Sequence, residues 1–568
     1  MDYKKNFENW YDDDRFDEET RKELEAIKNN DDEIKDRFYQ SLKFGTAGLR
    51  GKLGAGTNRM NKYMVAQATQ GFADTIAEGG EEAKKRGVAI AYDVRHKSLE
   101  FSKIAAEVFA ANGIKVYIHK DIEPTPVCSF TIRELGCVAG VMVTASHNPR
   151  EYNGYKAYNE EGSQIMDETA NKILSYIGNH QDFFAIPRID FEEGLRDGII
   201  EYVPEKVTDK YISLILDCTI NDEGIDKDIS VVYSPLNGTG NKLVRRILDE
   251  RGFTNIHVVK EQENPDPDFT TVGYPNPEDP KAFKYSEELG KKVGADLLLA
   301  TDPDADRCAV EVRDKNGEYQ FLTGNLIGTL LTQYILEGLN NKGELPENPA
   351  VVKSIVSTDL IAPIAAKYGV QKFDVLTGFK NIYDKANELE RNKSGKFVFG
   401  FEESIGYNYK DFVRDKDAVN SAMMITEMAA YYKAQGRTLI DVIEDIYKEH
   451  GYYSNEVVSI VLEGVDGQER IGRIMTEVRT NPIKEFNGDK VVKVIDYQND
   501  ETGLPKSNVL KYYFADESWV TLRPSGTEPK IKIYVNAIAD SMVKAVSYTH
   551  LTLPTIRHRC RSRWSPYH

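Results

Sequence analysis

The feature that most constrains the fold is an order of elements that occurs three times along the chain. In the first copy, residues 98–113 have the apolar spacing of an amphipathic helix with Ser98 as the predicted N-cap, and a strand is expected over 114–119. A second helical stretch over 128–136 then leads into the apolar run 138–145, which ends in polar residues. This alternation predicts a mixed α/β domain with a largely parallel sheet.

The same order of helix, strand, loop, helix and strand recurs over 241–301 and again over 361–401. After about residue 452 the pattern changes, because strand-like segments become more frequent and only one helix is expected. The fold class predicted is therefore α/β, with three similar mixed α/β domains and a smaller α+β domain at the C-terminal side. In such sheets ligands bind at the carboxyl ends of strands, so chemistry is expected in the loops that follow them.

These patterns divide the chain into six parts. The expected parts are a charged helical N-terminal extension (1–40), domain I (41–205), domain II (206–318), domain III (319–451), domain IV (452–545) and a tail (546–568).

The tail differs in composition from the rest of the chain, since it has four arginines and no acidic residue. A basic arm that binds nucleic acid is one interpretation, and a non-native or disordered segment is the other. We favour the second, because the tail follows a strand that looks like the end of a finished domain.

Charge and hydropathy exclude several classes of partner. The formal net charge is −18, so no sequence-wide attraction to nucleic acid or to an anionic membrane is expected. No apolar run approaches the roughly 18 residues of a membrane-spanning helix, and the first residues lack the apolar stretch of a signal peptide. The five cysteines form no CxxC pair, so neither a disulfide framework nor a zinc site is indicated. A cytoplasmic protein with reduced cysteines is expected.

The loop after the apolar run 138–145 carries a candidate nucleophile. Ser146 and His147 stand where a buried strand reaches the surface, and Lys156 follows a glycine turn. A serine beside a proton acceptor and cations can carry covalent chemistry, and a phosphorylated serine would be stabilised by the cations. Since Ser and Asn also favour turns, a purely structural turn is the alternative for this motif alone.

A second loop, 301–307, carries three carboxylates at alternate positions, Asp302, Asp304 and Asp306. Carboxylate oxygens suit Mg²⁺, and Arg307 adds a contact for phosphate or substrate. The spacing does not fit an EF-hand, and a haloacid-dehalogenase-type site is disfavoured by Arg307 in place of Thr or Val. A solvated acidic turn is less favoured, because carboxylates at the end of a buried strand need a counter-charge.

Four further motifs are weaker when taken singly. Segment 523–527 combines a guanidinium, two hydroxyls and a glycine, which suits phosphate binding, and segment 400–407 offers polar groups for sugar hydroxyls. A glycine-rich loop near residue 50 and a lysine after residue 376 complete the set. The candidate residues in these motifs are Arg50, Gly378, Lys380, Glu402, Ser404, Arg523, Ser525, Gly526 and Thr527.

Six motifs in this order, GTAGLRG, TASHNP with NGYK, DPDADR, TGFK, GFEES and RPSGTEP, resemble the α-D-phosphohexomutase superfamily and most closely its phosphoglucomutase branch. The resemblance spans residues 43 to about 540. It implies four domains around a central cleft, with domain IV acting as a lid. It also implies that Ser146 is a phosphoserine and a metal ligand, and that Asp302, Asp304 and Asp306 hold Mg²⁺.

The resemblance further implies a role for each remaining candidate. His147, Lys156, Arg50 and Lys380 fall on positions used for proton transfer and transition-state charge, and Arg307, Gly378, Glu402 and Ser404 on substrate contacts. Arg523, Ser525, Gly526 and Thr527 match the cradle for the phosphate that does not react. The metal loop lacks the glycines that many members have, and Phe401 precedes the glutamates, so sugar choice is less tightly implied.

The implied activity interconverts glucose 1-phosphate and glucose 6-phosphate, with glucose 1,6-bisphosphate as activator. Phosphopentomutase and phosphomannomutase are the alternatives within the superfamily, and a non-catalytic sugar-phosphate sensor is the alternative outside catalysis. Ser146 and all three aspartates are present, which disfavours the sensor. The implied partner is a hexose phosphate, with no nucleic acid and no membrane, and the implied assembly is a monomer or a dimer.

Overall fold

A computed structural model of the chain describes residues 2–45, 48–462, 464–486, 488–525, 530–547 and 549. It divides into two compact units. Unit 1 comprises Met1–Thr323 and Ser404–Gly436, and unit 2 comprises Gly324–Glu403 and Arg437–His568. Within the described ranges, no helix is long and apolar enough to cross a membrane.

The N-terminal segment of unit 1 forms three helices, α1 (Tyr3–Tyr11), α2 (Glu18–Ile27) and α3 (Asp31–Phe38). Their charged side chains lie mostly outside, but the aromatic ones are buried together. Trp10 stacks on Phe16 with ring centroids 4.4 Å apart, and both meet the edge of Tyr63 in α4 (Lys62–Ala77). Through this apolar cluster, the highly charged segment packs against the first α/β layer.

The first sheet of unit 1 has six strands in the order β1-β5-β4-β2-β3-β6. Strand β2 pairs in parallel with β3 and β4, whereas β5 pairs antiparallel with β1 and β4. The strands are β1 (Leu49–Lys52), β2 (Val88–Tyr92), β3 (Val116–Ile118), β4 (Ala139–Val143), β5 (Tyr152–Asn159) and β6 (Ile200–Tyr202).

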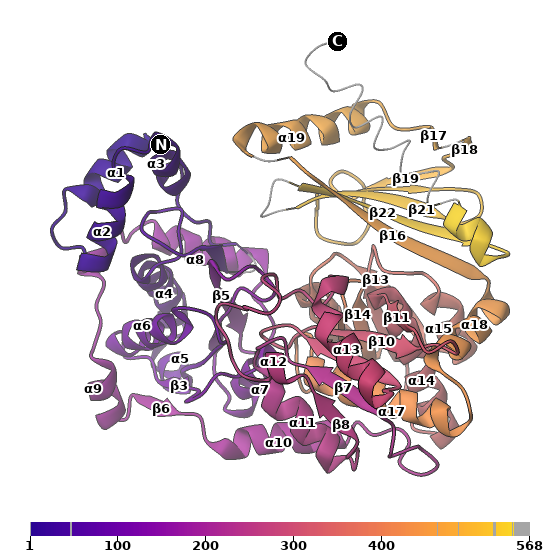
Figure 1. The fold of residues 1–568 in the computed structure, drawn as a ribbon. Helices are drawn as coiled ribbons and strands as arrows, with labels where there is room; N and C mark the ends of the chain where they lie inside the picture. Colours follow the sequence, from indigo (N-terminus) through magenta and orange to yellow (C-terminus); the bar gives the residue numbers. More distant parts are fainter. Residues whose placement is uncertain are drawn as a thin grey trace. The chain divides into compact units, whose positions relative to one another are not determined.

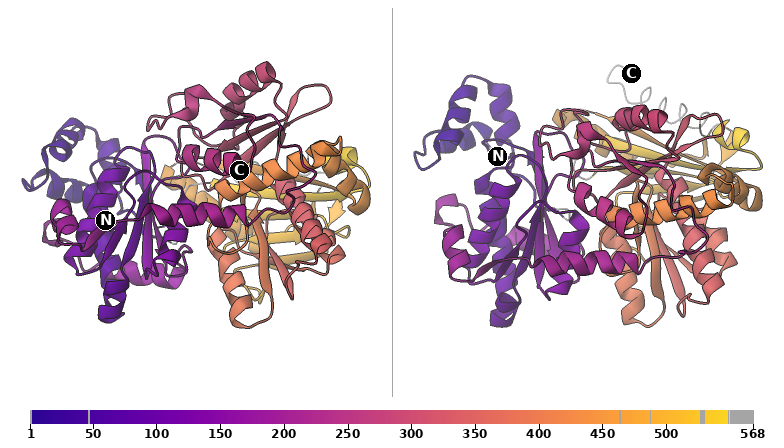
Figure 2. Two further views of the ribbon diagram at one scale, coloured as in Figure 1. Left: turned by 90° about the horizontal axis from the view of Figure 1, so that it is seen from below. Right: turned by 60° about the horizontal axis from the view of Figure 1, so that its bottom comes forward.

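Helices cover both faces of this sheet (Figures 1 and 2). The alternation of buried side chains along β2 agrees with this arrangement. Val88, Ile90 and Tyr92 join the core formed with α4 and α6 (Ser98–Ala111), while Ala89 and Ala91 face α7 (Thr125–Glu134). The remaining helices of this layer are α5 (Gly80–Arg86), α8 (Asp167–Ile177), η1 (Phe183–Ala185) and α9 (Phe191–Arg196).

The N-cap predicted for α6 is wrong by one residue. Lys97, with φ of 66°, occupies the N-cap, and Ser98 is the first helical residue. Its hydroxyl donates to Asp93 at 2.7 Å instead of capping the helix, because this carboxylate is buried directly beside it. The serine therefore belongs to a polar network at the end of β2.

The second sheet of unit 1 has five strands in the order β11-β10-β9-β7-β8. Strand β7 pairs in parallel with β8 and β9, and β10 pairs antiparallel with β9 and β11. The strands are β7 (Val231–Ser234), β8 (Ile256–Val258), β9 (Leu297–Thr301), β10 (Cys308–Arg313) and β11 (Tyr319–Leu322). The helices around it are α10 (Glu205–Leu216), α11 (Gly240–Glu250), α12 (Lys260–Glu263), η2 (Pro280–Phe283) and α13 (Lys284–Val293), and unit 1 also contains β15 (Gly406–Tyr409) and α17 (Ala418–Ala434).

Unit 2 begins with a parallel layer in which β12 pairs with both β13 and β14. Its strands are β12 (Pro349–Ser354), β13 (Gln371–Val375) and β14 (Lys396–Glu402). Its helices are α14 (Gly324–Lys342), α15 (Ile361–Lys367), α16 (Phe379–Arg391) and α18 (Leu439–His450).

Unit 2 continues with an antiparallel sheet in the order β16-β22-β21-β20-β19, one face of which is covered by α19 (Gly464–Thr480) (Figure 1). The strands are β16 (Tyr452–Val461), β19 (Lys493–Asp496), β20 (Leu510–Tyr513), β21 (Trp519–Pro524) and β22 (Lys530–Ala539), beside the small pair β17 (Glu485–Phe486) and β18 (Asp489–Lys490). This is the strand-rich region expected after residue 452. Of the tail, residues 548, 550 and 551–568 lie outside the described part of the chain.

Candidate active site

The candidate nucleophile, Ser146, lies in the loop between β4 and β5. Its φ is 53°, a left-handed conformation that is uncommon for a residue other than glycine and is often found at functional sites. The side chain is buried, and its hydroxyl donates to Oδ2 of Asp302 at 2.9 Å. The same hydroxyl oxygen lies 3.1 Å from Nδ1 of His147.

The guanidinium of Arg95 donates hydrogen bonds to the backbone of this loop. It donates to the carbonyl oxygens of Ser146 at 2.6 Å, Pro149 at 2.9 Å and Tyr152 at 3.1 Å, and also to that of Asn148. Arg95 is 3% exposed, so these charge-assisted hydrogen bonds form in a region without bulk water. They restrain the backbone of the loop from Ser146 to Tyr152.

A buried carboxylate completes the support. Asp93, at the end of β2, pairs with Arg95 at 3.3 Å and accepts a hydrogen bond from Thr144 at 2.7 Å. The hydroxyl oxygen of Thr144 in turn accepts from the backbone N–H of Ser146 at 2.8 Å. The ends of β2 and β4 thus determine the backbone position of Ser146.

The three aspartates of the loop after β9 form one buried cluster. One ligand atom from each of Asp302, Asp304 and Asp306 lies within 4.8 Å of the others. Oδ1 of Asp304 and Oδ1 of Asp306 are buried and have no hydrogen-bond partner. Burial together with the two neighbouring carboxylates raises the pKa of Asp302 well above its usual value. Buried carboxylate oxygens clustered in this way fit a divalent cation such as Mg²⁺.

Two lysines face the same cluster. Lys156 Nζ lies 2.7 Å from Asp304 Oδ2 and 3.1 Å from Asp306 Oδ2, and Lys416 Nζ lies 3.2 Å from Asp306 Oδ2. Although burial opposes its charge, Asp304 and Asp306 hold the pKa of Lys156 above its usual value. The site therefore presents fixed positive charge beside the nucleophile, as phosphoryl transfer requires.

The remaining candidates of unit 1 surround this centre. Arg50, on β1, donates to the side chain of Asn148 at 3.3 Å, and the backbone N–H of Arg307 donates to Asp302 at 3.0 Å. Burial and the guanidinium of Arg307 lower the pKa of His147 well below its usual value, so its imidazole is neutral. Ser404 also belongs to unit 1 and is half-buried.

The other candidates belong to unit 2. Gly378 has φ of 110°, and its N–H donates to the carboxylate of Glu402 at 2.6 Å, so these two motifs are adjacent. Lys380 lies in the first turn of α16. Arg523 is in β21 and donates to Tyr534 Oη at 3.4 Å, and Ser525 follows this strand. Gly526 and Thr527 lie outside the described residues.

Sequence reasoning missed several residues of the centre. Besides Arg95, Asp93 and Lys416, the hydroxyl of Thr125 donates to Asp304 Oδ2 at 2.8 Å, and its N–H donates to the Asp304 carbonyl at 2.8 Å. The signal available was the polar sequence Asp-Val-Arg directly after the buried strand β2, at the same sheet end as Ser146.

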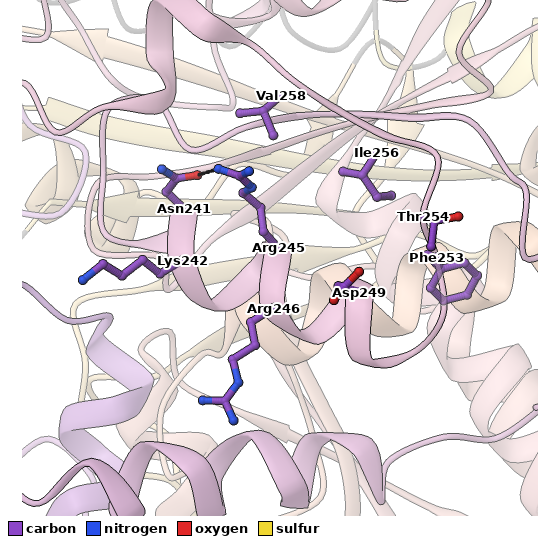
Figure 3. A pocket seen from close by; sticks show the side chains of 9 residues that line it. All are labelled: Asn241, Lys242, Arg245, Arg246, Asp249, Phe253, Thr254, Ile256 and Val258. Atoms are coloured by element: carbon purple, nitrogen blue, oxygen red, sulfur yellow. Dashed lines mark hydrogen bonds between the residues drawn. The ribbon is translucent and has the colours of Figure 1, made fainter.

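A separate hollow of about 560 Å³ lies beside α11 and β8 (Figure 3). Its cations lie on one side of α11, where Arg245 pairs with Glu263 at 2.6 Å and Arg246 with Asp209 at 2.8 Å. The residues that line the hollow belong to none of the six sequence motifs, so it is a weaker candidate than the centre at Ser146.

Comparison with known proteins agrees with this geometry. Four domain families match in sequence, each described as phosphoglucomutase/phosphomannomutase: α/β/α domain I over residues 41–182, domain II over 209–317, domain III over 323–450 and the C-terminal domain over 475–546. Together these matches cover most of the chain. The chain belongs to the phosphoglucomutase/phosphomannomutase family.

Relatives within this family are similar over almost their whole length. A phosphoglucomutase of Staphylococcus epidermidis is 39% identical over 527 residues, which is 90% of this chain and 93% of that protein. A phosphoglucomutase of Staphylococcus aureus strain USA300 is 38% identical over 89% of this chain and 91% of that protein.

Solved structures of the family share the fold. A phosphoglucomutase/phosphomannomutase family protein from Burkholderia thailandensis has a TM-score of 0.66 at 17% identity, over 92% of this chain and 98% of that one. The parafusin (phosphoglucomutase) of Paramecium, in an open form, has a TM-score of 0.67 at 17% identity, over 93% and 98%. These matches support the predicted fold class, three α/β domains and a distinct C-terminal domain.

Proposed function

We propose that the chain is a phosphoglucomutase, which interconverts α-D-glucose 1-phosphate and D-glucose 6-phosphate through a phosphoserine at Ser146 and a glucose 1,6-bisphosphate intermediate. The observation that carries the proposal is the 2.9 Å contact between Ser146 Oγ and Asp302, inside a cluster of three carboxylates and two lysines. The relatives named phosphoglucomutase, at 38–39% identity, support this choice of sugar.

In the first half-reaction, the bond between phosphorus and Ser146 Oγ breaks while a sugar hydroxyl oxygen bonds to the phosphorus. The hydroxyl proton must leave, and Lys156, His147, Arg50 and Lys380 are the groups proposed for proton transfer and for offsetting charge. In the second half-reaction, Ser146 Oγ bonds to the other phosphorus of the bisphosphate, the bond between that phosphorus and its sugar oxygen breaks, and the sugar oxygen takes up a proton. Mg²⁺ bound by Asp302, Asp304, Asp306 and the Ser146 side chain would supply Lewis-acid stabilisation of the phosphoryl charge.

Substrate contacts are proposed for two sets of residues. Arg307, Gly378, Glu402 and Ser404 would contact the sugar, and Arg523, Ser525, Gly526 and Thr527 would hold the phosphate that does not react. We retain the division into an extension (1–40), domain I (41–205), domain II (206–318), domain III (319–451), domain IV (452–545) and a tail (546–568) for these roles. We also propose that glucose 1,6-bisphosphate is the activator and that the protein is cytoplasmic.

A coupled assay tests the proposal. Purified protein with Mg²⁺ and a trace of glucose 1,6-bisphosphate is given glucose 1-phosphate, mannose 1-phosphate or ribose 1-phosphate, and the formation of each product is followed. The highest kcat/KM is expected with glucose 1-phosphate. A higher value with mannose or ribose would instead identify a phosphomannomutase or phosphopentomutase, and no turnover with binding of sugar phosphate would favour the sensor.

A further inference from the structure

The sheet of domain IV presents one face to α19 and the other to the first layer of unit 2. Along β21, Val520 and Leu522 pack with α19, so Trp519 and Arg523 lie on the opposite face. Lys511 of β20 pairs with Thr521, and it shares this opposite face with Trp519. A proposed phosphate-binding residue and a buried lysine thus lie on the same side of one sheet.

Lys511 is 2% exposed and contacts the domain III side of this interface directly. Its Nζ donates to the carbonyl oxygen of Ile355 at 2.7 Å and lies 3.8 Å from the ring centroid of Trp519. The indole N–H of Trp519 donates to Asp359 at 2.8 Å. These contacts join β20 and β21 to the segment that follows β12.

The charged groups around Lys511 do not balance. Lys353 pairs with Asp359 at 3.0 Å and Asp374 at 2.9 Å, and Lys372 pairs with Asp374 at 2.7 Å. Among the residues that the structure describes, none places a carboxylate within ion-pair distance of Lys511. Three lysines therefore lie near two aspartates, and two of these lysines, Lys353 and Lys511, are buried.

The other titratable groups at this interface do not pair with Lys511. The carboxylate of Glu403 accepts hydrogen bonds from Ser354 at 3.0 Å and Ser357 at 3.1 Å instead. The phenol of Tyr513, on β20, lies with its ring centroid 5.2 Å from Lys511 Nζ, and Tyr497 and Tyr534 belong to the same apolar cluster. Burial raises the pKa of all three, to about 12 for Tyr497, so they are uncharged near neutral pH.

The protonation of Lys511 is consequently linked to the packing of domain IV on domain III. Burial lowers its pKa from 10.5 to about 7, although Asp359 and Asp374 oppose this shift. The packed state holds fewer protons than a separated state in which Lys511 is exposed, so packing is favoured as the pH rises above about 7. Below that pH, burial of the full charge opposes packing.

We propose that Lys511 is a positioning residue for the reaction: by gaining and losing its proton it makes the packing of the strand that carries Arg523 against domain III dependent on pH. This inference rests on the proposed function, because it takes Arg523 as a phosphate ligand. It predicts a lower KM for the sugar phosphate at pH 8 than at pH 6, after correction for the titration of the substrate itself.

Lys511→Met, Lys511→Arg and the matched control Lys367→Met test the proposal. Lys367 is a 42%-exposed lysine of α15 that pairs with Glu449, so its loss should leave the pH dependence unchanged. The KM for glucose 1-phosphate is measured from pH 6 to pH 8 in each protein. The ratio of the wild-type KM to the Lys511→Met KM should fall by up to about tenfold as the pH is raised from 6 to 8. The ratio of the kcat values should change less.

Arginine keeps its charge throughout this range, so the Lys511→Arg ratio should stay near the wild-type value at pH 6. Parallel KM profiles for wild type and Lys511→Met would overturn the proposal. Amide hydrogen exchange of β20 and β21, corrected for the intrinsic rate at each pH, tests the same linkage without activity. Protection should increase with pH in the wild type and remain constant in Lys511→Met.

The exchange measurement also distinguishes a failure of the proposed function from a failure of the role of Lys511. Absence of mutase activity in every protein, together with pH-dependent protection in the wild type only, would contradict the proposed function and keep the linkage at Lys511. Turnover with equal protection at both pH values would contradict the role of Lys511 and keep the proposed function.

Discussion

The hydroxyl of Ser146 and the carboxylate of Asp302, 156 residues apart in sequence, are joined by a hydrogen bond of 2.9 Å. This bond links the loop after β4 to the loop after β9, and so links the two sheets of unit 1 at their carboxyl ends. A nucleophile and a candidate cation site are thereby adjacent.

Replacement of Ser146 by alanine should remove the phosphoenzyme and lower kcat/KM by about 10³-fold or more, since the oxygen proposed to carry the phosphoryl group is lost. Ser163→Ala is the matched control, because Ser163 is also buried but bonds only within its own turn. Retained turnover in the Ser146 variant would refute the nucleophile.

Thr125→Val should weaken Mg²⁺ binding by about tenfold, because the hydroxyl that orients Asp304 is lost while the shape of the side chain is kept. The Mg²⁺ concentration that gives half-maximal activity measures this effect. Thr125→Ser keeps the hydroxyl and should restore most of the affinity. Equal Mg²⁺ requirements in all three proteins would remove Thr125 from the support of the cation site.

Arg95→Lys should lower kcat by roughly 10–10²-fold with little change in KM, because one ammonium cannot reach the four carbonyls that the guanidinium holds. Added guanidinium should partly restore kcat in Arg95→Ala. A variant whose KM rises while kcat is unchanged would show that Arg95 acts on binding and does not position Ser146.

Glu123 gives a pH-dependent prediction for stability. Burial raises its pKa from 4.5 to about 8, so the folded state holds an extra proton between these values and this group destabilises the fold increasingly as the pH rises through them. Glu123→Gln should therefore leave Tm unchanged at pH 4 and raise it by about 2–4 °C at pH 9.

The exposed residue Glu81, replaced in the same way, provides the control for Glu123. Thermal unfolding of the three proteins at both pH values makes the comparison. A Glu123→Gln variant that is less stable than the wild type at pH 9 would contradict a half-buried carboxyl that resists ionisation.

The regular elements could be predicted from the sequence because each repeated copy keeps its helical and strand periodicity. In the first copy, β4 lies within the apolar run 138–145, which ends in polar residues. In the second copy, β9 is the apolar run that leads into the acidic loop. The nucleophile and the carboxylates were recognisable because few arrangements at the end of a buried strand tolerate such groups without a ligand.

The supporting network could not be predicted in the same way. Arg95 donates to carbonyl oxygens, which have no sequence signature, and Lys416 reaches Asp306 from a segment 110 residues later. Contacts of this kind depend on how separate elements pack, not on local spacing. Ser98 is predicted at an N-cap, but its hydroxyl donates to Asp93 at the end of the preceding strand, a local contact that the helical pattern does not encode.

The most direct measurement is the mass of the peptide that contains Ser146, before and after the purified protein is treated with glucose 1,6-bisphosphate and Mg²⁺. We expect the mass of one added phosphoryl group on this serine, and its loss when glucose 6-phosphate or glucose 1-phosphate is then supplied. An unmodified Ser146 in protein that nevertheless turns over glucose 1-phosphate, or phosphate on a different residue, would contradict the phosphoserine mechanism.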